Sequence, residues 1–366
     1  MPSPRAEGNV TLMTVARAVG VSPMTVSNAY NQPHKLSPAL RERILGAARD
    51  LGYPGPNPAA RSLRRGRAGS IGLLFGEALT YVFQDAGAVE FLHGVAEGTA
   101  RDNSVLQLIA ALDTDGREGA SLLANAIVDG LVVWSLPDRH PLVRLARERN
   151  IPLVTHGSPR LDGVPFVGID DRAAAKAAAE HLLELGHRSL AVISFPFGPS
   201  RRARHRDRAD VGRPSYRVTR ERLAGYRAAA TAATPEPAAL DVYEVAVNSR
   251  DEGHRAALAL LQATPPPTAV LAMSDELAVG VLAAARELDV RVPHDLSVTG
   301  WDDSPTARAG ERALTTVRQS LHDQGRTCAR LLIAATRGEI AAGDLVHLAP
   351  WQLIRRDSTG SPPPNQ

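Results

Sequence analysis

Hydrophobic residues near the start of the chain recur at helical spacing. Between Leu12 and Val19, apolar positions return every three or four residues, which predicts a short helix with one apolar face. Thr11 stands where an N-cap hydroxyl would accept a free backbone N–H, and Gly20 is suited to the positive φ that ends many helices. This stretch is therefore expected to be one short helix followed by a glycine turn.

Two further helices are expected after that turn. Ser22 is a good N-cap for the second helix, and Pro23 fits its first turn, where no N–H is needed. Ser37 is expected to be the N-cap of a third helix, and Pro38 is expected to lie in its first turn. The positions expected to face the core are Val26, Ala29 and Tyr30 in the second helix and Leu40, Ile44, Ala47, Ala48 and Leu51 in the third. Short helices joined by a tight glycine turn form a helix-turn-helix.

The hydrophobic pattern changes from Gly69 onward. Apolar runs of strand length lie at 70–75, 105–112, 129–135, 151–155, 189–194, 269–273 and 296–301. Longer alanine-rich segments with helical periodicity separate them, for example residues 171–186 and 275–289. Strands that are apolar throughout and alternate with helices predict parallel sheets covered on both faces, and the length of this region favours two such sheets. Ligands in such folds bind at the carboxyl ends of the strands.

Charge divides the chain at the same place. The sequence of 366 residues has a net charge of +3, but residues 1–68 carry +7 and the remainder carries −4. A basic N-terminal module on a mildly acidic body is typical of a DNA-binding domain attached to another function. In a helix-turn-helix the second helix enters the major groove, where short hydroxyl and amide side chains suit contacts with phosphates and base edges.

Several classes of protein are disfavoured by what the sequence lacks. Cys328 is the only cysteine, so no intramolecular disulfide can form and a reducing compartment is expected. No apolar run reaches membrane-span length, and residues 1–20 lack the apolar core of a signal peptide. A soluble, cytoplasmic protein without a membrane partner is therefore expected. Motifs of hydrolases, metalloproteases and P-loop enzymes are missing, so no catalytic residue, metal site or cofactor is predicted.

Three segments of the N-terminal region occur in an informative order: VTLMTVARAVGVSPMTVSN, LSPALRERILGAARDLGY and NPAARSLRRGR. Together they resemble the DNA-binding part of the LacI/GalR (lac repressor) family of bacterial transcription regulators. The later segments HLLELGHRSLAVIS, RERLAGYRAA, AMSDELAVG, SVTGWDD and LTTVRQ are similar to landmarks of that family's effector-binding core. Thr14 departs from the family pattern, which carries an acid at this position. The resemblance extends from about Val10 to Asp357.

The resemblance implies an all-α helix-turn-helix DNA-binding domain plus hinge helix, followed by an α/β two-subdomain core with parallel sheets, similar to periplasmic sugar-binding proteins. The implied ranges are 1–56 for the helix-turn-helix domain, 57–68 for the hinge helix and linker, 69–357 for the core, about 69–163 with 321–348 for its N-subdomain, and about 164–318 with 349–357 for its C-subdomain. The tail at 358–366 is rich in Pro, Ser and Gly and is expected to be disordered. It has no leucine heptads, so the tetramerising helix of some family members is not expected.

Positions that match the family's pattern are expected to take its DNA-contacting roles. The base-reading residues are Pro23, Met24 and Asn28, and the phosphate-contacting residues are Ser22, Thr25, Ser27 and Asn31. Asn28 could bond adenine at two points, whereas Pro23 and Met24 offer only apolar contact, for example to a thymine methyl. One helix-turn-helix reads one half-site, so a homodimer on a pseudopalindromic double-stranded operator is implied.

Residues 57–66 match the family's hinge helix, with Asn57 as its cap. Leu63 matches the leucine that wedges into the minor groove, with Ala60 against the groove floor, and the neighbouring arginines would hold phosphates. The alternative is that Leu63 is a linker residue that packs on the body.

In the core, the resemblance implies a cleft between the subdomains that binds a small effector, a sugar or a related metabolite. The polar candidates are Asp170, Arg222, Ser274, Asp275 and Asp302, and the aromatic ones are Tyr81 and Phe83. Charged groups suit this task because they bond pairs of hydroxyls strongly. Trp134 could also stack on a sugar ring, although packing is the simpler explanation. Structural alternatives stay open: Asp170 as a turn residue, and Arg222 paired with Asp302.

The implied function is a sequence-specific transcriptional regulator, a repressor, whose operator affinity depends on the effector. Two alternatives share the core fold: a sugar-binding protein that serves transport, and a metabolic enzyme with an accessory DNA-binding domain. Transport would need export, whereas here a DNA-binding head stands where a signal peptide would be. The arginine-dense stretch 197–217 is interpreted as a solvated loop.

Overall fold

The computed structural model describes residues 10–55, 67–110, 117–206, 213–309 and 313–364. The chain divides into two compact units, Met1–Ala68 and Gly69–Gln366. The predicted hinge residues Asn57, Ala60 and Leu63 lie outside the described residues, so their roles stay predictions.

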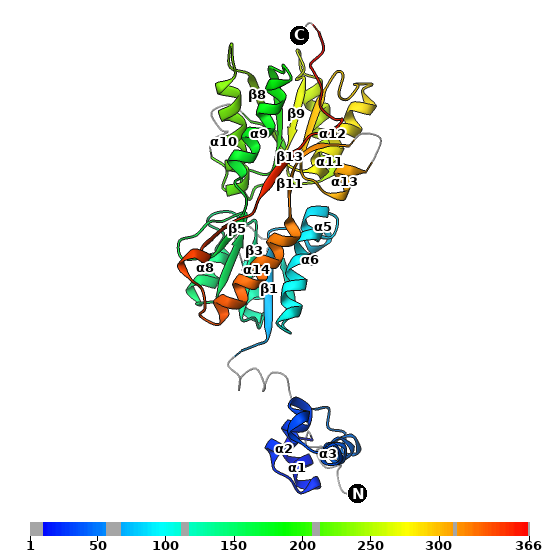
Figure 1. The fold of residues 1–366 in the computed structure, drawn as a ribbon, viewed down its shortest axis with the longest axis vertical. Helices are drawn as coiled ribbons and strands as arrows, with labels where there is room; N and C mark the ends of the chain where they lie inside the picture. Colours follow the sequence, from blue (N-terminus) through cyan, green and yellow to red (C-terminus); the bar gives the residue numbers. More distant parts are fainter. Residues whose placement is uncertain (1–9, 56–66, 111–116, 207–212, 310–312, 365–366) are drawn as a thin grey trace, which may run out of the picture. The chain divides into compact units, whose positions relative to one another are not determined.

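The first unit contains the helices α1 (Leu12–Val19), α2 (Pro23–Asn31) and α3 (Pro38–Asp50), with a short 3-10 turn, η1 (Pro33–Lys35), before α3 (Figure 1). The side chains of Thr11, Ser22 and Ser37 each accept a hydrogen bond from the backbone N–H three residues further on. Gly20 ends α1 in the left-handed region, with φ at 73°. The predicted helices and their caps are confirmed.

The three helices enclose a small apolar core made by Val15, Ala16, Val26, Ala29, Ile44 and Ala48. Leu51 is 37% exposed because it follows the last turn of α3, so the prediction that it faces the core is wrong. Thr14 closes a capping box, since its hydroxyl accepts the Thr11 backbone N–H at 3.3 Å. A hydrogen bond thus takes the place of the acid that the family carries here.

The N-subdomain of the second unit contains a parallel sheet with the order β12-β5-β4-β3-β1-β2 among the described residues. Its strands are β1 (Ser70–Phe75), β2 (Val105–Ala110), β3 (Gly130–Trp134), β4 (Leu153–His156), β5 (Phe166–Gly168) and β12 (Val346–Leu348). Its helices are α5 (Leu79–Val82), α6 (Ala86–Arg101), α7 (Arg117–Asn125), α8 (Pro141–Glu148) and α14 (Leu321–Thr336), with the 3-10 turn η3 (Ala342–Asp344).

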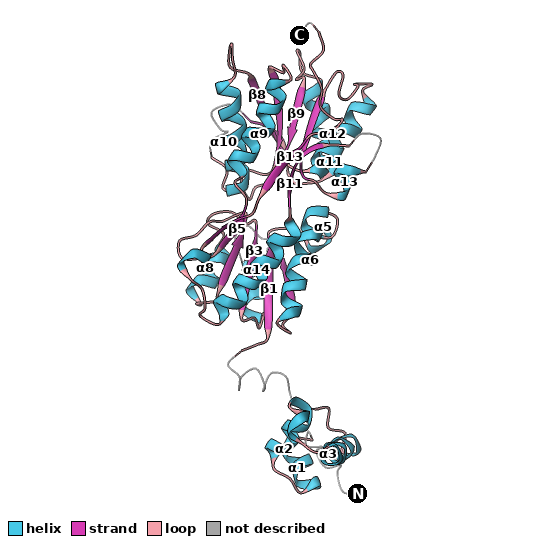
Figure 2. Cartoon of the chain, viewed as in Figure 1, coloured by secondary structure: helices cyan, strands magenta, loops and turns pink. Residues whose placement is uncertain are grey.

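The C-subdomain contains a second sheet with the order β13-β11-β10-β9-β6-β8-β7, parallel except for β13 and β7 at its edges. Its strands are β6 (Ser189–Ser194), β7 (Arg204–Arg206), β8 (Ala239–Glu244), β9 (Ala269–Ala272), β10 (Ser297–Asp302), β11 (Thr315–Gln319) and β13 (Trp351–Ile354). Its helices are α9 (Asp171–Glu184), α10 (Arg217–Ala232), α11 (Arg250–Leu261), α12 (Asp275–Glu287) and α13 (Pro305–Arg308). Helices cover both sheets (Figure 2), as the apolar strands predict.

The chain passes between the two subdomains after β5, between β11 and α14, and between β12 and β13 (Figure 1). The predicted boundary at residue 164 is wrong, because β5 pairs with β4 and so belongs to the N-subdomain sheet. The first crossing therefore follows Gly168. A strand of three residues has too little pattern of its own to reveal which sheet it joins.

The expected disorder of the tail is wrong for its first residues. Ser358 is fully buried, and its Oγ donates to the Val298 carbonyl at 2.6 Å and accepts the Thr315 N–H at 2.8 Å. The Gly360 N–H donates to Ser297 Oγ at 3.0 Å. Low hydrophobicity is misleading here because these small residues complete the hydrogen bonds of β10 and β11 without burying much apolar surface.

Close contact between α6 and α14 fixes the second crossing. A methyl group at Gly94 would lie 1.9 Å from the His322 carbonyl oxygen, so only glycine allows the two helices to approach this closely. This contact holds the start of α14 beside the carboxyl ends of the strands. In the described part of the chain, none of the helices has the length and apolar composition that crossing a membrane requires.

Candidate functional site

The predicted base-reading residues lie at an accessible end of α2. Pro23 and Met24 occupy its first turn and are exposed, Met24 to 61%. Asn28 follows one turn later and is half-buried. An exposed helix N-terminus with an amide one turn along is the arrangement that a recognition helix needs.

The predicted phosphate contacts are also bonded to one another. Ser22 Oγ and Thr25 Oγ1 lie 2.8 Å apart. Asn31 Nδ2 donates to the Ser27 carbonyl at 3.0 Å and lies 3.2 Å from Ser27 Oγ, and Ser27 is only 9% exposed. These side chains therefore stabilise α2 itself, and their contacts with DNA stay predictions.

The second candidate site is a cavity of about 130 Å³ between the two subdomains, at the carboxyl ends of strands from both sheets. Three predicted effector residues line it: Tyr81, Arg222 and Asp302. The lining also includes residues outside the predicted effector set, among them Glu77, Asp85, His156, Phe195, Tyr216, Asn248 and Gln319, and it includes Trp134, for which the sequence favours packing. Several of these stand at or just after the end of a strand, which is the sequence signal that would have found them.

Four predicted effector residues lie outside the lining. Asp170 is exposed and caps α9, and Ser274 caps α12. Asp275 is buried and accepts a hydrogen bond from Thr316 Oγ1 at 2.7 Å. Phe83 is 58% exposed on the surface. Capping and ligand binding favour the same residue types, so the sequence pattern alone does not separate them.

Arg222 is held in the cavity wall by buried contacts. Its Nε donates to Asp171 Oδ1 at 3.0 Å and its Nη1 donates to the Met273 carbonyl at 2.6 Å. Its guanidinium carbon lies 3.8 Å from the centre of the Trp301 ring. Asp171, the neighbour of the predicted Asp170, thus neutralises this arginine, and the alternative pair with Asp302 is not found among the described ion pairs.

Two carboxylates from different subdomains converge on Gly87. A methyl group at this glycine would lie 3.3 Å from both Asp85 Oδ1 and Asp302 Oδ2. Burial raises the pKa of Asp85, and burial together with the nearby acids raises the pKa of Asp302 to about 6 even though Arg222 opposes this. Asp302 has a φ of 105°, a backbone conformation that is uncommon for residues other than glycine and costs roughly 1–3 kcal/mol.

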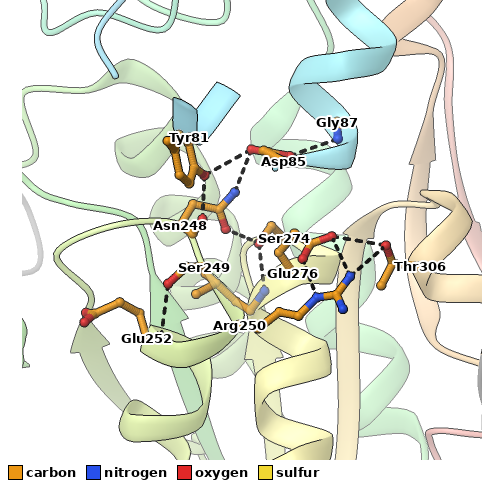
Figure 3. A network of polar contacts seen from close by, with 11 residues as sticks. Tyr81, Asp85, Gly87, Asn248, Ser249, Arg250, Glu252, Ser274, Glu276 and Thr306 are labelled. Atoms are coloured by element: carbon orange, nitrogen blue, oxygen red, sulfur yellow. Dashed lines mark hydrogen bonds and ion pairs between the residues drawn. The ribbon is translucent and has the colours of Figure 1, made fainter. Parts of the chain in front are cut away.

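Asn248 joins the subdomains at one side of the cavity (Figure 3). Its Nδ2 donates to Asp85 Oδ2 at 3.0 Å, and its backbone carbonyl accepts the Tyr81 hydroxyl at 2.5 Å. Ser274 Oγ donates to Asn248 Oδ1, so the predicted Ser274 supports a lining residue without lining the cavity itself. These bonds link Tyr81 and Asp85 of the N-subdomain to Asn248 of the C-subdomain.

In the arginine-dense stretch, the interpretation as a solvated loop is wrong for Arg201 and Arg206, whereas Arg202, Arg204 and Arg213 are exposed as expected. Arg201 pairs with Glu77 across the cleft and donates to the Gly76 carbonyl at 2.6 Å. Arg206, in edge strand β7, donates to the buried Glu244 at 2.6 Å. Arg201 and Arg206 are therefore held by acidic partners that lie far from them in the sequence.

Aromatic side chains of both subdomains line the cavity, Tyr81 and Trp134 from the N-subdomain and Phe195 and Tyr216 from the C-subdomain. Trp134 stacks on His156 with ring centres 4.8 Å apart and an angle of 17°. It also meets Phe91 edge-on at 4.1 Å, so Trp134 both packs in the core and lines the cavity. Burial lowers the pKa of His156 to about 4, which keeps its ring neutral at neutral pH.

Comparisons with known proteins match both parts of the chain to family models. The family model "Bacterial regulatory proteins, lacI family" matches residues 11–57, and the model "Periplasmic binding protein-like domain" matches residues 179–359. An HTH-type transcriptional regulator of Mycobacterium tuberculosis is 38% identical over 362 residues, which cover 98% of this chain and 99% of that protein.

Solved structures give the same result. The crystal structure of a LacI-family regulator from Corynebacterium glutamicum matches with a TM-score of 0.73 and 32% identity, over 97% of this chain and 99% of that one. The complex of the regulator CelR with cellobiose matches with a TM-score of 0.67 and 29% identity, over 95% and 99%. These proteins regulate transcription and are not enzymes. The chain belongs to the LacI family of DNA-binding transcriptional regulators, with a helix-turn-helix head and a periplasmic-binding-protein-like effector core.

Proposed function

We propose that this chain is a homodimeric repressor of a pseudopalindromic operator, and that its effector is a small, uncharged, hydroxyl-rich molecule such as a sugar. The choice of effector rests on which charged side chains around the cavity have an ionic partner. Arg222 and Arg201 are paired with Asp171 and Glu77, whereas the lining carboxylates of Asp302 and of Asp85, which caps α6, have no cationic partner among the described ion pairs.

This balance favours hydroxyl donors over anions. Carboxylates accept strong hydrogen bonds from hydroxyl groups, whereas a phosphate ester would bring a second negative charge beside them. Trp134 and Tyr81 supply aromatic surface of the kind that packs against a sugar ring. The complex of the similar regulator CelR with cellobiose supports a carbohydrate.

A thermal-shift screen of the full chain tests this proposal. The panel contains free monosaccharides, polyols and nucleosides, each beside its phosphate ester. An uncharged compound at 100 times its Kd is expected to stabilise the native chain by about 2.7 kcal/mol and so to raise its melting temperature by several degrees. A phosphate ester that stabilises the chain as strongly as its parent compound would refute the proposed ligand class.

The head is tested separately with Asn28→Ala. This change is expected to weaken binding to the selected operator by roughly 1–3 kcal/mol per half-site and to relax base preference at one symmetric pair of positions. Fluorescence anisotropy with operator and random duplexes at fixed salt measures both effects. If the two duplexes lose affinity equally, Asn28 is not a base reader.

A further inference from the structure

A chain of hydrogen bonds runs along one wall of the cavity and crosses from one subdomain to the other. Gln319 Nε2 donates to Asp302 Oδ1 at 2.7 Å, and Gln324 Nε2 donates to Gln319 Oε1 at 3.0 Å. Gln324 Oε1 then lies 2.9 Å from His156 Nε2. Asp302 and Gln319 belong to the C-subdomain strands β10 and β11, whereas Gln324 and His156 belong to α14 and β4 of the N-subdomain.

The direction of this chain is fixed at its carboxylate end. An ionised carboxylate only accepts hydrogen bonds, so Gln319 must present its amide N–H to Asp302 and its oxygen to Gln324. Gln324 is oriented in the same sense and presents its own oxygen to His156. The histidine must therefore carry its proton on Nε2.

The other ring nitrogen is then a hydrogen-bond acceptor. A neutral imidazole has one N–H, so a proton on Nε2 leaves a lone pair on Nδ1. This Nδ1 is buried and has no hydrogen-bond partner within the residues that the structure describes. The ring itself lines the cavity and is held flat against Trp134.

We propose that the Asp302 carboxylate is the acceptor for a donor group of the effector, and that Gln319, Gln324 and the Nε2–H tautomer of His156 are positioning groups that fix this acceptor across the two subdomains. The proposal rests on the effector function proposed above. It makes the site selective for a ligand that presents a hydroxyl or N–H donor to Asp302, because a deoxy or ether analogue would leave this carboxylate without that partner. Because the relay contains residues of both subdomains, both subdomains contribute to the position of the Asp302 carboxylate.

Proton–nitrogen NMR spectra of the histidine rings in the full, ligand-free chain test the relay directly. The chain has 11 histidines, so a His156→Asn variant assigns the resonance. The Nε2–H tautomer is expected for His156. Gln324→Met removes the acceptor and is expected to shift the ring signals toward a mixture of tautomers. Gln352→Met, which changes an exposed glutamine outside the relay, is expected to leave them unchanged.

An Nδ1–H tautomer in the unmodified chain would overturn the proposal, whether or not the variants fold. Unchanged ring signals in Gln324→Met would also overturn it. With a compound identified by the thermal-shift screen, Gln324→Met is expected to lower affinity about tenfold and Gln352→Met not at all. A screen without any hit would reject the proposed effector class, whereas the tautomer decides the relay, so the two failures are distinguishable.

Discussion

Arg222→Ala is expected to lower both the stability of the core and its affinity for effector. The change removes the guanidinium that pairs with Asp171 at 3.0 Å and packs against Trp301. Among the described ion pairs, the buried Asp171 then keeps Arg217 alone, at 3.3 Å. Breaking a buried ion pair typically costs 3–5 kcal/mol. For a unit of this size that corresponds to a fall in melting temperature of roughly 10 °C.

Calorimetry and ligand titration on the same sample separate the two roles of Arg222. Arg227→Ala is the matched control, because Arg227 lies on the same helix and is exposed. It should keep the unmodified melting temperature and ligand affinity. A destabilised Arg222→Ala protein with normal ligand affinity would show that Arg222 is only structural. An unchanged melting temperature would contradict the ion pair itself.

Asp302→Asn is expected to stabilise the core at neutral pH while weakening effector binding. The pKa of Asp302 rises from 3.8 to about 6 in the folded chain, mainly through burial. A raised carboxyl pKa means that its contribution to stability is fully present below about pH 4 and is lost as the pH rises through about 6. Two pKa units correspond to about 3 kcal/mol, an upper value because water in the cavity still reaches the side chain.

Asparagine suits this test because it keeps the oxygen that accepts the Gln319 hydrogen bond and tolerates a positive φ. The variant should therefore match the unmodified chain at pH 4 and exceed its stability at pH 8. Its affinity for an uncharged effector should fall by about 1.5–3 kcal/mol, the value of a hydrogen bond to a charged group. Asp303→Asn is the contrast: Arg318 and Arg356 each donate to Asp303 at 2.6 Å, so this change should destabilise the core at pH 8. A stability difference between Asp302→Asn and the unmodified chain that does not vary with pH would contradict the account.

The parts of the fold that sequence predicts well are those governed by local chemistry. Thr11, Ser22 and Ser37 cap helices because a hydroxyl at that position satisfies a free N–H whatever surrounds it. The strands not predicted are β5, β7, β8, β11, β12 and β13. Three of them, β5, β7 and β12, have only three residues each and are defined by their pairing partners, and β8 is partly exposed rather than apolar throughout.

The same distinction applies to the residues of the candidate site: some could be predicted from local sequence and others could not. Arg222 and Asp302 could be predicted because they stand within recognisable segments, and both line the cavity. His156, Gln319 and Gln324 could not, because their importance depends on a hydrogen-bond chain between residues up to 168 positions apart. The pair between Arg201 and Glu77 spans 124 positions and escaped prediction for the same reason.

Occupancy of the cleft is expected to change the affinity of the chain for DNA, and titration of an operator duplex measures this coupling. An operator duplex, selected from a random pool with the full chain, is titrated by fluorescence anisotropy with and without a saturating compound from the thermal-shift screen. A ligand with different affinities for the two states of the core shifts operator affinity by the coupling free energy, typically 1–3 kcal/mol, or about 5- to 150-fold in Kd. A change in operator Kd within this range is expected. An operator Kd that stays the same while the compound fills the cavity would show that the cleft does not control DNA binding.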